Sequence, residues 1–294
     1  MATLISNPGA PALDDALLAR VCRTLRGATL SWLAPGIAAD VCFTPDAPVD
    51  ERMLAGQLRS ALVAHPVDVV VQRSAHRRKR LLVADMDSTM IGQECLDELA
   101  DRVGLKSRIA AITERAMNGE IAFEPALRER VDLLRGLPLK IIDEVLVERI
   151  RASPGAVALV HTMRAHGAYT CLVSGGFTLF TDRVAAMIGF HENRANRLVI
   201  EAGRIESVEE PILGRDAKLA ALLDLAAKLG LARELTLSVG DGANDVAMLQ
   251  AAGLGVAYRA KPKVAASAHA RIDHGDLTAL LYVQGYRREE FVEA

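Results

Sequence analysis

Apolar residues in the first part of the chain recur at two different spacings. They recur every four residues from Leu13 to Leu25 and again from Leu54 to Leu62, where the second run follows Asp50, a residue type that favours helix N-caps. Both runs predict helices. The other apolar segments are short and predict strands, namely ATLIS, ATLSWL, AADVCF and VDVVV. The expected order over residues 1–75 is therefore strand, helix, strand, strand, helix, strand.

This βαββαβ order is that of a ferredoxin-like domain, and a domain of this shape is similar to the ACT-type amino-acid-binding modules. It contains no residues typical of a particular ligand, so we expect a structural or dimerising role, which would make a homodimer, at least as much as regulation. The basic run HRRKR at 76–80 follows and is interpreted as a solvated linker. We predict a self-contained first domain over 1–76 and a second domain over 77–294.

Residues 80–294 alternate buried-looking apolar segments with helical patterns, which is typical of a parallel sheet. Strands are predicted at 80–85, 169–174, 235–241 and 253–258, and each ends in glycine, hydroxyl or acidic residues. Ligands of open α/β sheets bind outside these carboxyl ends. The fold class is therefore predicted to be α/β, with a Rossmann-like parallel sheet.

The segment between the first two of these strands is too long for a simple crossover. Its apolar spacing predicts helices, with glycines suited to helix ends at Gly104, Gly119 and Gly136. We expect these helices to form an inserted cap over the strand ends, at about 90–153.

Composition narrows the class of protein. Apolar residues make up 51% of the 294 residues and charged residues 24%, with a net charge of −2, so no basic surface for nucleic acid is expected. The four cysteines show no CxxC spacing, and the first residues lack a signal-peptide pattern. No apolar run reaches the roughly 18 to 20 residues that span a bilayer. We expect a cytoplasmic protein with reduced thiols and no membrane partner.

The stretch LLVADMDSTM delivers two carboxylates, Asp85 and Asp87, to the end of a buried strand. Such a pair is weak evidence of a catalytic site by itself, because aspartates at strand ends often cap the next turn. Two residues along a strand end suffice, however, to put both on one face. One carboxylate could then attack phosphorus while its neighbour transfers protons. This chemistry also needs a metal, a phosphate cradle and a counter-cation.

All three requirements have candidates at the other predicted strand ends. Asp241 and Asp245, in SVGDGANDVAML, offer hard oxygen ligands that favour magnesium. Ser174 and Gly175, in LVSGGFT, could bind phosphate oxygens at a helix start. Lys218 lies on a predicted helix, where an isolated lysine is usually solvated; beside these groups it becomes the candidate counter-cation.

The pieces DMDST, SGG, Lys218 and GDGANDVAML occur in the order of the haloacid dehalogenase superfamily of phosphatases, which the chain resembles over about residues 80–285. Dehalogenases proper lack the second aspartate, so Asp87 argues against them. The resemblance makes Asp85 the nucleophile and Asp87 the general acid and base. It implies Mg²⁺ bound by Asp85, the backbone carbonyl of Asp87 and Asp241, with Asp245 supporting the metal site.

The same resemblance, through DSTMIGQECLDELA and ITERAMNGEIAFEPALRERVDLL, implies O-phosphoserine as substrate and a place in serine biosynthesis. Charge alone also suggests that Glu94 pairs with the substrate ammonium and Arg130 grips its carboxylate, although each could simply be a charge on a solvated helix. The implied phosphate and substrate contacts are Ser174, Gly175, Lys218, Asn244, Glu94, Arg130, Met117 and Phe123.

Other functions stay open at this point, and one is hydrolysis of the phosphate ester of a related small molecule. A phosphotransferase that passes the phosphoryl group to an alcohol such as homoserine would use the same residues, because water and alcohol differ only in access to the intermediate. A non-catalytic amino-acid sensor built on the first domain is the binding-protein alternative. The intact set of Asp85, Asp87, Lys218 and Asp241 argues against the sensor.

Overall fold

The computed structural model describes residues 1–45, 47–117, 120–214 and 216–293. The N-terminal part forms a four-stranded antiparallel sheet in the order β2-β3-β1-β4, which confirms the predicted ferredoxin-like order. Both helices begin at aspartate N-caps, Asp14 and Asp50. Its elements are β1 (Ala2–Ser6), α1 (Asp15–Thr24), β2 (Thr29–Ala34), β3 (Ala38–Cys42), α2 (Glu51–Ala61) and β4 (Val67–Val71).

The N-terminal sheet is buried on both faces. One face packs under α1 and α2, while Ile5, Ala38 and Val70 on the other face belong to the main hydrophobic core of the rest of the chain. The N-terminal sheet therefore shares this part of its core with the rest of the chain.

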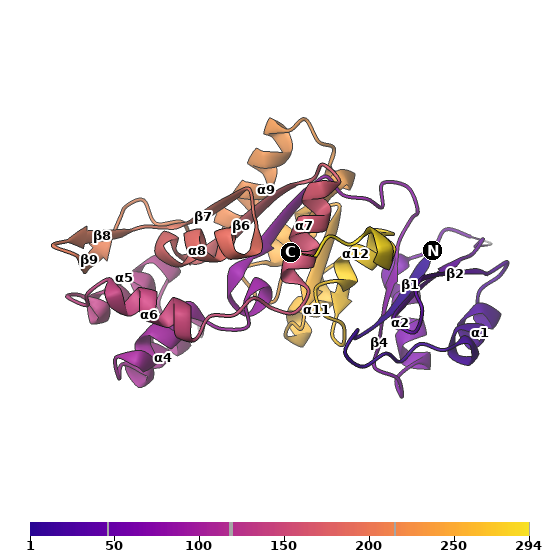
Figure 1. Ribbon diagram of the computed structural model, residues 1–294, viewed down its shortest axis with the longest axis horizontal. Coiled ribbons are helices and arrows are strands. Elements are labelled where there is room, and N and C mark those ends of the chain that lie inside the picture. The colour runs from indigo at the N-terminus through magenta and orange to yellow at the C-terminus, as the bar shows by residue number, and fades with distance from the viewer. Residues whose placement is uncertain (46, 118–119, 215, 294) are drawn as a thin grey trace.

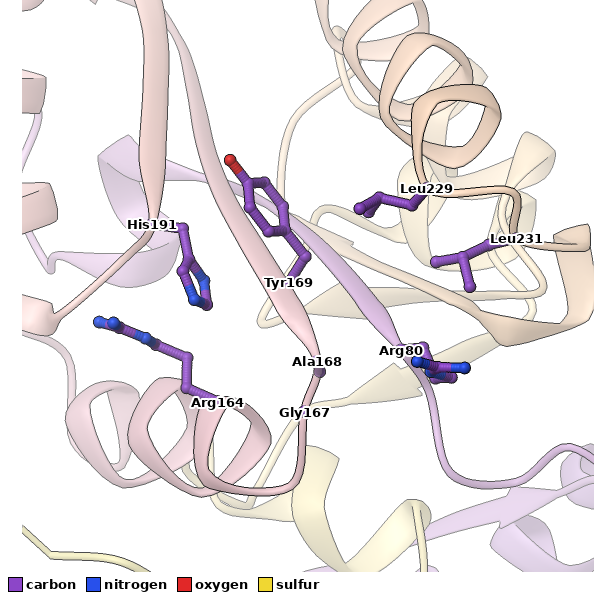
Figure 2. Close-up of a pocket in the computed structure, with 8 residues that line it drawn as sticks. All are labelled: Arg80, Arg164, Gly167, Ala168, Tyr169, His191, Leu229 and Leu231. Atoms are coloured by element: carbon purple, nitrogen blue, oxygen red, sulfur yellow. The ribbon is translucent and has the colours of Figure 1, made fainter.

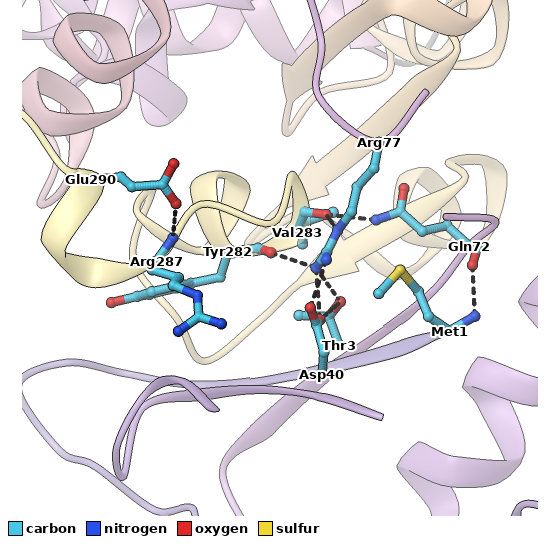
Figure 3. A network of polar contacts seen from close by, with 9 residues as sticks. All are labelled: Met1, Thr3, Asp40, Gln72, Arg77, Tyr282, Val283, Arg287 and Glu290. Carbon is cyan, nitrogen blue, oxygen red and sulfur yellow. Dashed lines mark hydrogen bonds and ion pairs between the residues drawn. The ribbon is translucent and has the colours of Figure 1, made fainter. Parts of the chain in front are cut away.

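The basic run 76–80 is not the solvated linker that the sequence predicted. Arg77 donates two hydrogen bonds to the carboxylate of Asp40, at 2.6 and 2.7 Å, and two more to the backbone carbonyls of Tyr282 (2.8 Å) and Val283 (2.6 Å). Figure 3 shows this guanidinium between the N-terminal sheet and the C-terminal helix. Lys79 is also buried, and its ammonium donates to the carbonyl of Glu234. The run therefore joins the two parts.

We expect Arg77→Ala to lower the free energy of unfolding by about 3 to 5 kcal/mol, because it leaves the buried Asp40 carboxylate without its positively charged partner. Urea unfolding followed by circular dichroism measures the change. Arg73→Ala is the matched control: the Arg73 side chain is 90% exposed and 3.7 Å from Glu51, so its loss should cost less than about 0.5 kcal/mol. Equal stability of the two variants would contradict this role for Arg77.

The second part is built on a six-stranded parallel sheet in the order β12-β11-β10-β5-β6-β7. Its central strand β5 lies between β10 and β6, so the carboxyl ends of these three strands meet at one edge. The strands are β5 (Leu81–Asp85), β6 (Tyr169–Phe177), β7 (Glu192–Asn196), β10 (Thr236–Gly240), β11 (Leu254–Tyr258) and β12 (Ala270–Ile272). The four strands expected from sequence are confirmed; β7 and β12 were not predicted.

Helices cover both faces of this sheet (Figure 1). Leu81 and Val83 of β5 pack in the cluster with α9 and α10, whereas Leu82 and Ala84 pack in the cluster with α7 and α12, since alternate residues of a strand face opposite sides. The helices are α7 (Ala156–Ala165), α8 (Thr178–Ile188), α9 (Ala217–Lys228), α10 (Val246–Ala251), α11 (Pro262–Ser267) and α12 (Ala279–Val283).

The segment between β5 and β6 is helical, as predicted. It contains α3 (Cys95–Arg102), α4 (Lys106–Met117), α5 (Phe123–Leu134) and α6 (Lys140–Glu148). Gly104 and Gly136 follow helices with positive φ angles of 73° and 82°, as expected of helix ends, and Gly119 lies outside the described residues. Figure 1 places α4, α5 and α6 at the end of the molecule opposite the N-terminal sheet.

A hairpin that the sequence did not predict, β8 (Leu198–Glu201) and β9 (Arg204–Val208), joins the helical insert to the sheet. The N–H groups of Gly136 and Leu139 donate to the carbonyls of Ile205 and Gly203, at 2.7 and 3.0 Å. The insert is thus attached to the core by these hydrogen bonds with the hairpin, in addition to the two chain segments that connect it to the core. Among the residues that the structure describes, no helix is both long and apolar enough to cross a membrane.

Candidate active site

The predicted aspartates lie at the carboxyl ends of two neighbouring central strands, β5 and β10. Asp85 is the last residue of β5, and the chain then turns tightly over Met86–Met90, where Ser88 has a φ of 55°. Asp87 therefore lies beyond the strand and is placed by this turn, not by strand alternation as the sequence suggested. Asp241 follows β10, and Asp245 is the N-cap residue of α10.

Lys218 reaches the strand ends from the first turn of α9. Its ammonium lies 2.6 Å from a carboxylate oxygen of Asp85 and 2.7 Å from one of Asp245, and all three side chains are buried. Burial disfavours the charge of Lys218, but the two carboxylates outweigh burial and raise its pKa. The lysine thus carries a fixed positive charge against Asp85, as the counter-cation interpretation expected.

Carboxylates crowd this edge of the sheet. Burial and then the charge of Asp245 raise the pKa of Asp85 well above its ordinary value, although Lys218 opposes them. Burial also raises the pKa of Asp241, whose carboxylate accepts a hydrogen bond of 2.9 Å from the Thr89 hydroxyl. A bound cation would relieve this repulsion.

Asp85, Asp241 and Asp245 form an acidic triad that could hold a metal ion. One carboxylate oxygen from each can be chosen so that all lie within 4.8 Å of one another. An all-oxygen donor set of this kind suits a hard divalent cation. Thr89 orients Asp241 and was missed by the sequence analysis, although its hydroxyl stands beside the paired aspartates in DSTM.

Asp87 faces a different environment from Asp85. Its carboxylate accepts hydrogen bonds from the N–H of Cys95 (2.8 Å) and the hydroxyl of Ser174 (3.1 Å). Burial raises the pKa of Asp87, and these two hydrogen bonds oppose the rise. The second carboxylate can therefore hold a proton more readily than an exposed aspartate, which suits a proton donor.

Ser174 and Gly175 lie inside β6, because this strand runs to Phe177 and α8 begins only at Thr178. Their expected position at a helix start is therefore wrong by a few residues. Ser174 is buried and bonded to Asp87, and a Cβ added to Gly175 would lie 3.3 Å from the ring of Phe123. Glycine here lets the aromatic ring of the insert approach the strand end closely.

A cavity of about 570 Å³ opens between the helical insert and the strand ends. The predicted residues that line it are Phe123, Arg130, Ser174, Gly175, Lys218 and Asn244. On the insert side, Thr113, Ala116 and Ile121 add a mainly apolar wall that the sequence analysis did not identify. The cavity therefore has a polar end at the sheet and an apolar end at the insert.

Two predicted cap residues carry charge near the cavity. Arg130 is half-buried and donates only to the carbonyl of Ala126 among the bonds of the described residues, so its guanidinium has no ion-pair partner there. Glu94 does not line the cavity; it is exposed and accepts a hydrogen bond of 2.6 Å from Ser88. Desolvation by the surrounding protein and the charge of Asp87 nevertheless raise its pKa to about 7. The side chain of Met117 lies outside the described residues.

A second hollow lies at the opposite edge of the same sheet. Figure 2 shows Arg80 and Tyr169, at the start of β5 and β6, with Arg164, His191 and Leu231 around it. None of the described residues predicted for the site lines it, and Asp85 lies at the other end of β5. The chemistry is therefore assigned to the cavity at the carboxyl ends.

Comparisons with known proteins agree with this geometry. The family model of haloacid dehalogenase-like hydrolases matches residues 82–250. A phosphoserine phosphatase of a Polaromonas species is 43% identical over 208 residues, which cover 69% of this chain and 88% of that protein. The chain belongs to the haloacid dehalogenase-like hydrolases. Within that family its place is with the phosphoserine phosphatases.

Two solved structures also match the N-terminal sheet. A hydrolase of this family from Salmonella enterica superposes with a TM-score of 0.84 at 28% identity, covering 96% of this chain and 97% of that one. A probable phosphoserine phosphatase from Vibrio cholerae gives a TM-score of 0.79 at 30% identity, covering 98% of this chain and 87% of that one. The combination of N-terminal sheet, parallel sheet and helical insert is thus shared by relatives.

Proposed function

We propose that this chain hydrolyses O-phospho-L-serine to L-serine and phosphate, as a phosphoserine phosphatase, through a phosphoryl group carried on Asp85. The observation that carries the proposal is the position of Asp85, which stands at the end of the central strand beside Lys218 and two further aspartates. An oxygen of Asp85 bonds to phosphorus as the ester oxygen leaves with its electron pair. Hydrolysis of the aspartyl phosphate then restores the carboxylate. This reaction is the last step of serine biosynthesis.

The metal is proposed to be Mg²⁺, held by Asp85, Asp241 and the carbonyl of Asp87, with Asp245 in support. Bound there, it would offset the negative charge of the phosphate. Lys218 holds Asp85 and Asp245 in place by direct ion pairs, so the nucleophile has a defined orientation.

Asp87 is proposed as the general acid and base. Its raised pKa lets it carry the proton that the leaving serine oxygen needs, and it can then take a proton from the attacking water. Ser174 fixes one oxygen of this carboxylate. Ser174, Gly175 and Asn244 are proposed to receive the phosphate oxygens with Lys218.

Substrate choice is assigned to the helical insert. Arg130 is proposed to bind the carboxylate of phosphoserine, because its guanidinium faces the cavity without an ion pair among the described residues. Glu94 is proposed to bind the ammonium; a cation beside it would favour its charged form. Phe123, with Met117, is proposed to close the apolar side over the bound substrate.

Arg130→Ala should lower kcat/KM for phosphoserine by a factor that corresponds to about 2 to 4 kcal/mol of lost transition-state stabilisation. This is the order expected when one partner of a desolvated charge pair is removed. The same change should scarcely affect para-nitrophenyl phosphate, which has no carboxylate. Phosphate release measures both. Arg128→Ala is the matched control, since Arg128 lies on the same helix but pairs with Glu210 at the surface. A uniform fall on both substrates would mean that Arg130 only holds the insert together.

Transfer to an alcohol is the second candidate reaction, because the same aspartyl phosphate can be attacked by water or by a hydroxyl group. Assays of phosphoserine with and without added homoserine distinguish them. Release of one phosphate per serine, unchanged by homoserine, is expected of the hydrolase. Formation of phosphohomoserine at the expense of phosphate would favour the transferase.

The division into domains over 1–76 and 77–294, with a cap at about 90–153, is kept as a proposal, as are the homodimer and the cytoplasmic location. Four free cysteines fit a reducing compartment. For the N-terminal sheet we propose a structural role, because its second face is filled by the core of the hydrolase part.

A further inference from the structure

Asn196, the last residue of β7, is buried beside the phosphate end of the cavity. Its side chain is only 3% exposed and is not among the described residues that line the cavity, so it is enclosed by its protein neighbours. Its carboxamide nevertheless bonds to two segments that do line the cavity. These segments are the strand end at Gly175 and the loop at Leu213 and Gly214.

The first contact continues as a chain of hydrogen bonds toward Asp87. The Asn196 amide donates to the carbonyl of Gly175 at 2.9 Å, and the N–H of the same peptide group, on Gly176, donates to the Ser174 hydroxyl at 2.9 Å. That hydroxyl donates in turn to Asp87 at 3.1 Å. Because the Ser174 oxygen already accepts from Gly176, its own proton is directed at the carboxylate. Linked bonds of this kind polarise one another.

The second contact holds the loop that leads into the helix of Lys218. The N–H of Leu213 donates to the carboxamide oxygen of Asn196 at 2.6 Å, and the carbonyl of Leu213 accepts from its amide nitrogen at 3.4 Å. A carboxamide offers two donors and an acceptor in one plane, which is what two carbonyls and one N–H require. Aspartate has the same shape and no donor.

We propose that Asn196 is a positioning residue for phosphoryl transfer. It fixes the Gly175–Gly176 peptide group relative to the loop at Leu213. The Ser174 hydroxyl is thereby held toward Asp87, and the polar end of the cavity keeps its shape. The inference rests on the proposed phosphatase function and adds to it a residue outside the cavity. Asn196 supports the polar end of the cavity, where the phosphate is proposed to bind. The loss of activity in its variants should therefore be the same for every phosphate ester, whereas the loss in Arg130→Ala should depend on the substrate carboxylate.

The test compares Asn196→Ala and Asn196→Asp with Asn193→Ala. Asn193 is the matched control because it lies on the same strand and its carboxamide also makes two hydrogen bonds, to Thr181 and Asp182 of α8, away from the cavity. With magnesium present, kcat and KM are measured for phosphoserine and para-nitrophenyl phosphate. Inhibition by orthovanadate, which imitates the five-coordinate phosphorus of the transition state, and thermal unfolding are measured on the same samples.

Both Asn196 variants should lose about tenfold to hundredfold in kcat/KM on the two substrates alike, the scale of a small misplacement of reacting groups. Their inhibition constants for orthovanadate should rise by a similar factor. Asn193→Ala should stay within about twofold of wild type in kcat/KM and in its inhibition constant for orthovanadate. This should hold even if its melting temperature falls as far as that of the Asn196 variants.

Kinetics and vanadate inhibition of Asn196→Ala equal to those of Asn193→Ala would overturn the inference. If the alanine variant does not fold, Asn196→Asp is judged by the same thresholds, since it keeps the acceptor for Leu213 and replaces the donors by a second acceptor oxygen. Wild type that releases no phosphate from either substrate would instead overturn the proposed function.

Discussion

Asp85→Asn should reduce turnover of phosphoserine by about 10⁴- to 10⁶-fold, the scale seen when a nucleophile is removed from a site that is otherwise intact. The amide has the shape of the carboxylate but cannot attack phosphorus, so no aspartyl phosphate forms. The fold should survive, because Lys218 keeps its ion pair with the buried Asp245. Steady-state phosphate release and thermal unfolding measure the two effects separately.

Acid quenching with labelled substrate gives a second, direct measurement of this step. Wild type should retain label on the protein, and Asp85→Asn should retain none. Asp224→Asn, the same change on the exposed side of α9, is the control and should keep both activity and label. Turnover of Asp85→Asn within tenfold of wild type would rule out the covalent route.

Removal of divalent metal should abolish activity, to less than about 1% of wild type, and added Mg²⁺ should restore it. The reason is the charge at the strand ends: Asp85, Asp241 and Asp245 lie together, and a phosphate dianion cannot approach them unless a cation offsets the repulsion. The measurement is phosphatase activity in excess chelator. The control is the same chelator presaturated with Mg²⁺. Full activity in free chelator would contradict the assignment of the triad.

Metal binding can also be followed without turnover. A cation that binds the folded triad should raise the melting temperature increasingly as its concentration exceeds its Kd, and Asp241→Asn should weaken this shift. Calcium should compete for the site but support catalysis poorly, because its larger and looser coordination shell does not keep the in-line geometry. A melting temperature that neither ion changes would contradict metal binding at the triad.

The helical insert is attached to the core both by its own chain segments and by the hairpin β8–β9. Its chain links run side by side, with Ile91 paired to Ala152, and β9 forms backbone bonds with residues 136–139. Arg128 and Glu210 add a surface ion pair between α5 and the loop after the hairpin. Any movement of the insert must therefore carry the hairpin β8–β9 with it.

Local periodicity was enough to predict most of the elements. The helices of the N-terminal part and the strands β5, β6, β10 and β11 appear where the sequence places them, because buried strands and amphipathic helices need a regular spacing of apolar residues. The edge strands β7 and β12 were missed. ENRAN is mostly polar and ARI is only three residues long, so neither carries a strand pattern of its own.

The sequence also determined the chemistry, because Asp85, Asp87, Lys218, Asp241 and Asp245 stand in motifs specific to one family. Tertiary structure decided what these residues meet. Lys218 faces two carboxylates only because β5 and β10 are neighbours, and Arg77 is largely enclosed because Asp40 and Val283 come to it from distant parts of the chain. Asn196 carries no motif; its partners are chosen by the packing of β6, β7 and the loop at Leu213. Contacts between residues far apart in sequence leave no local pattern, and only the folded chain reveals them.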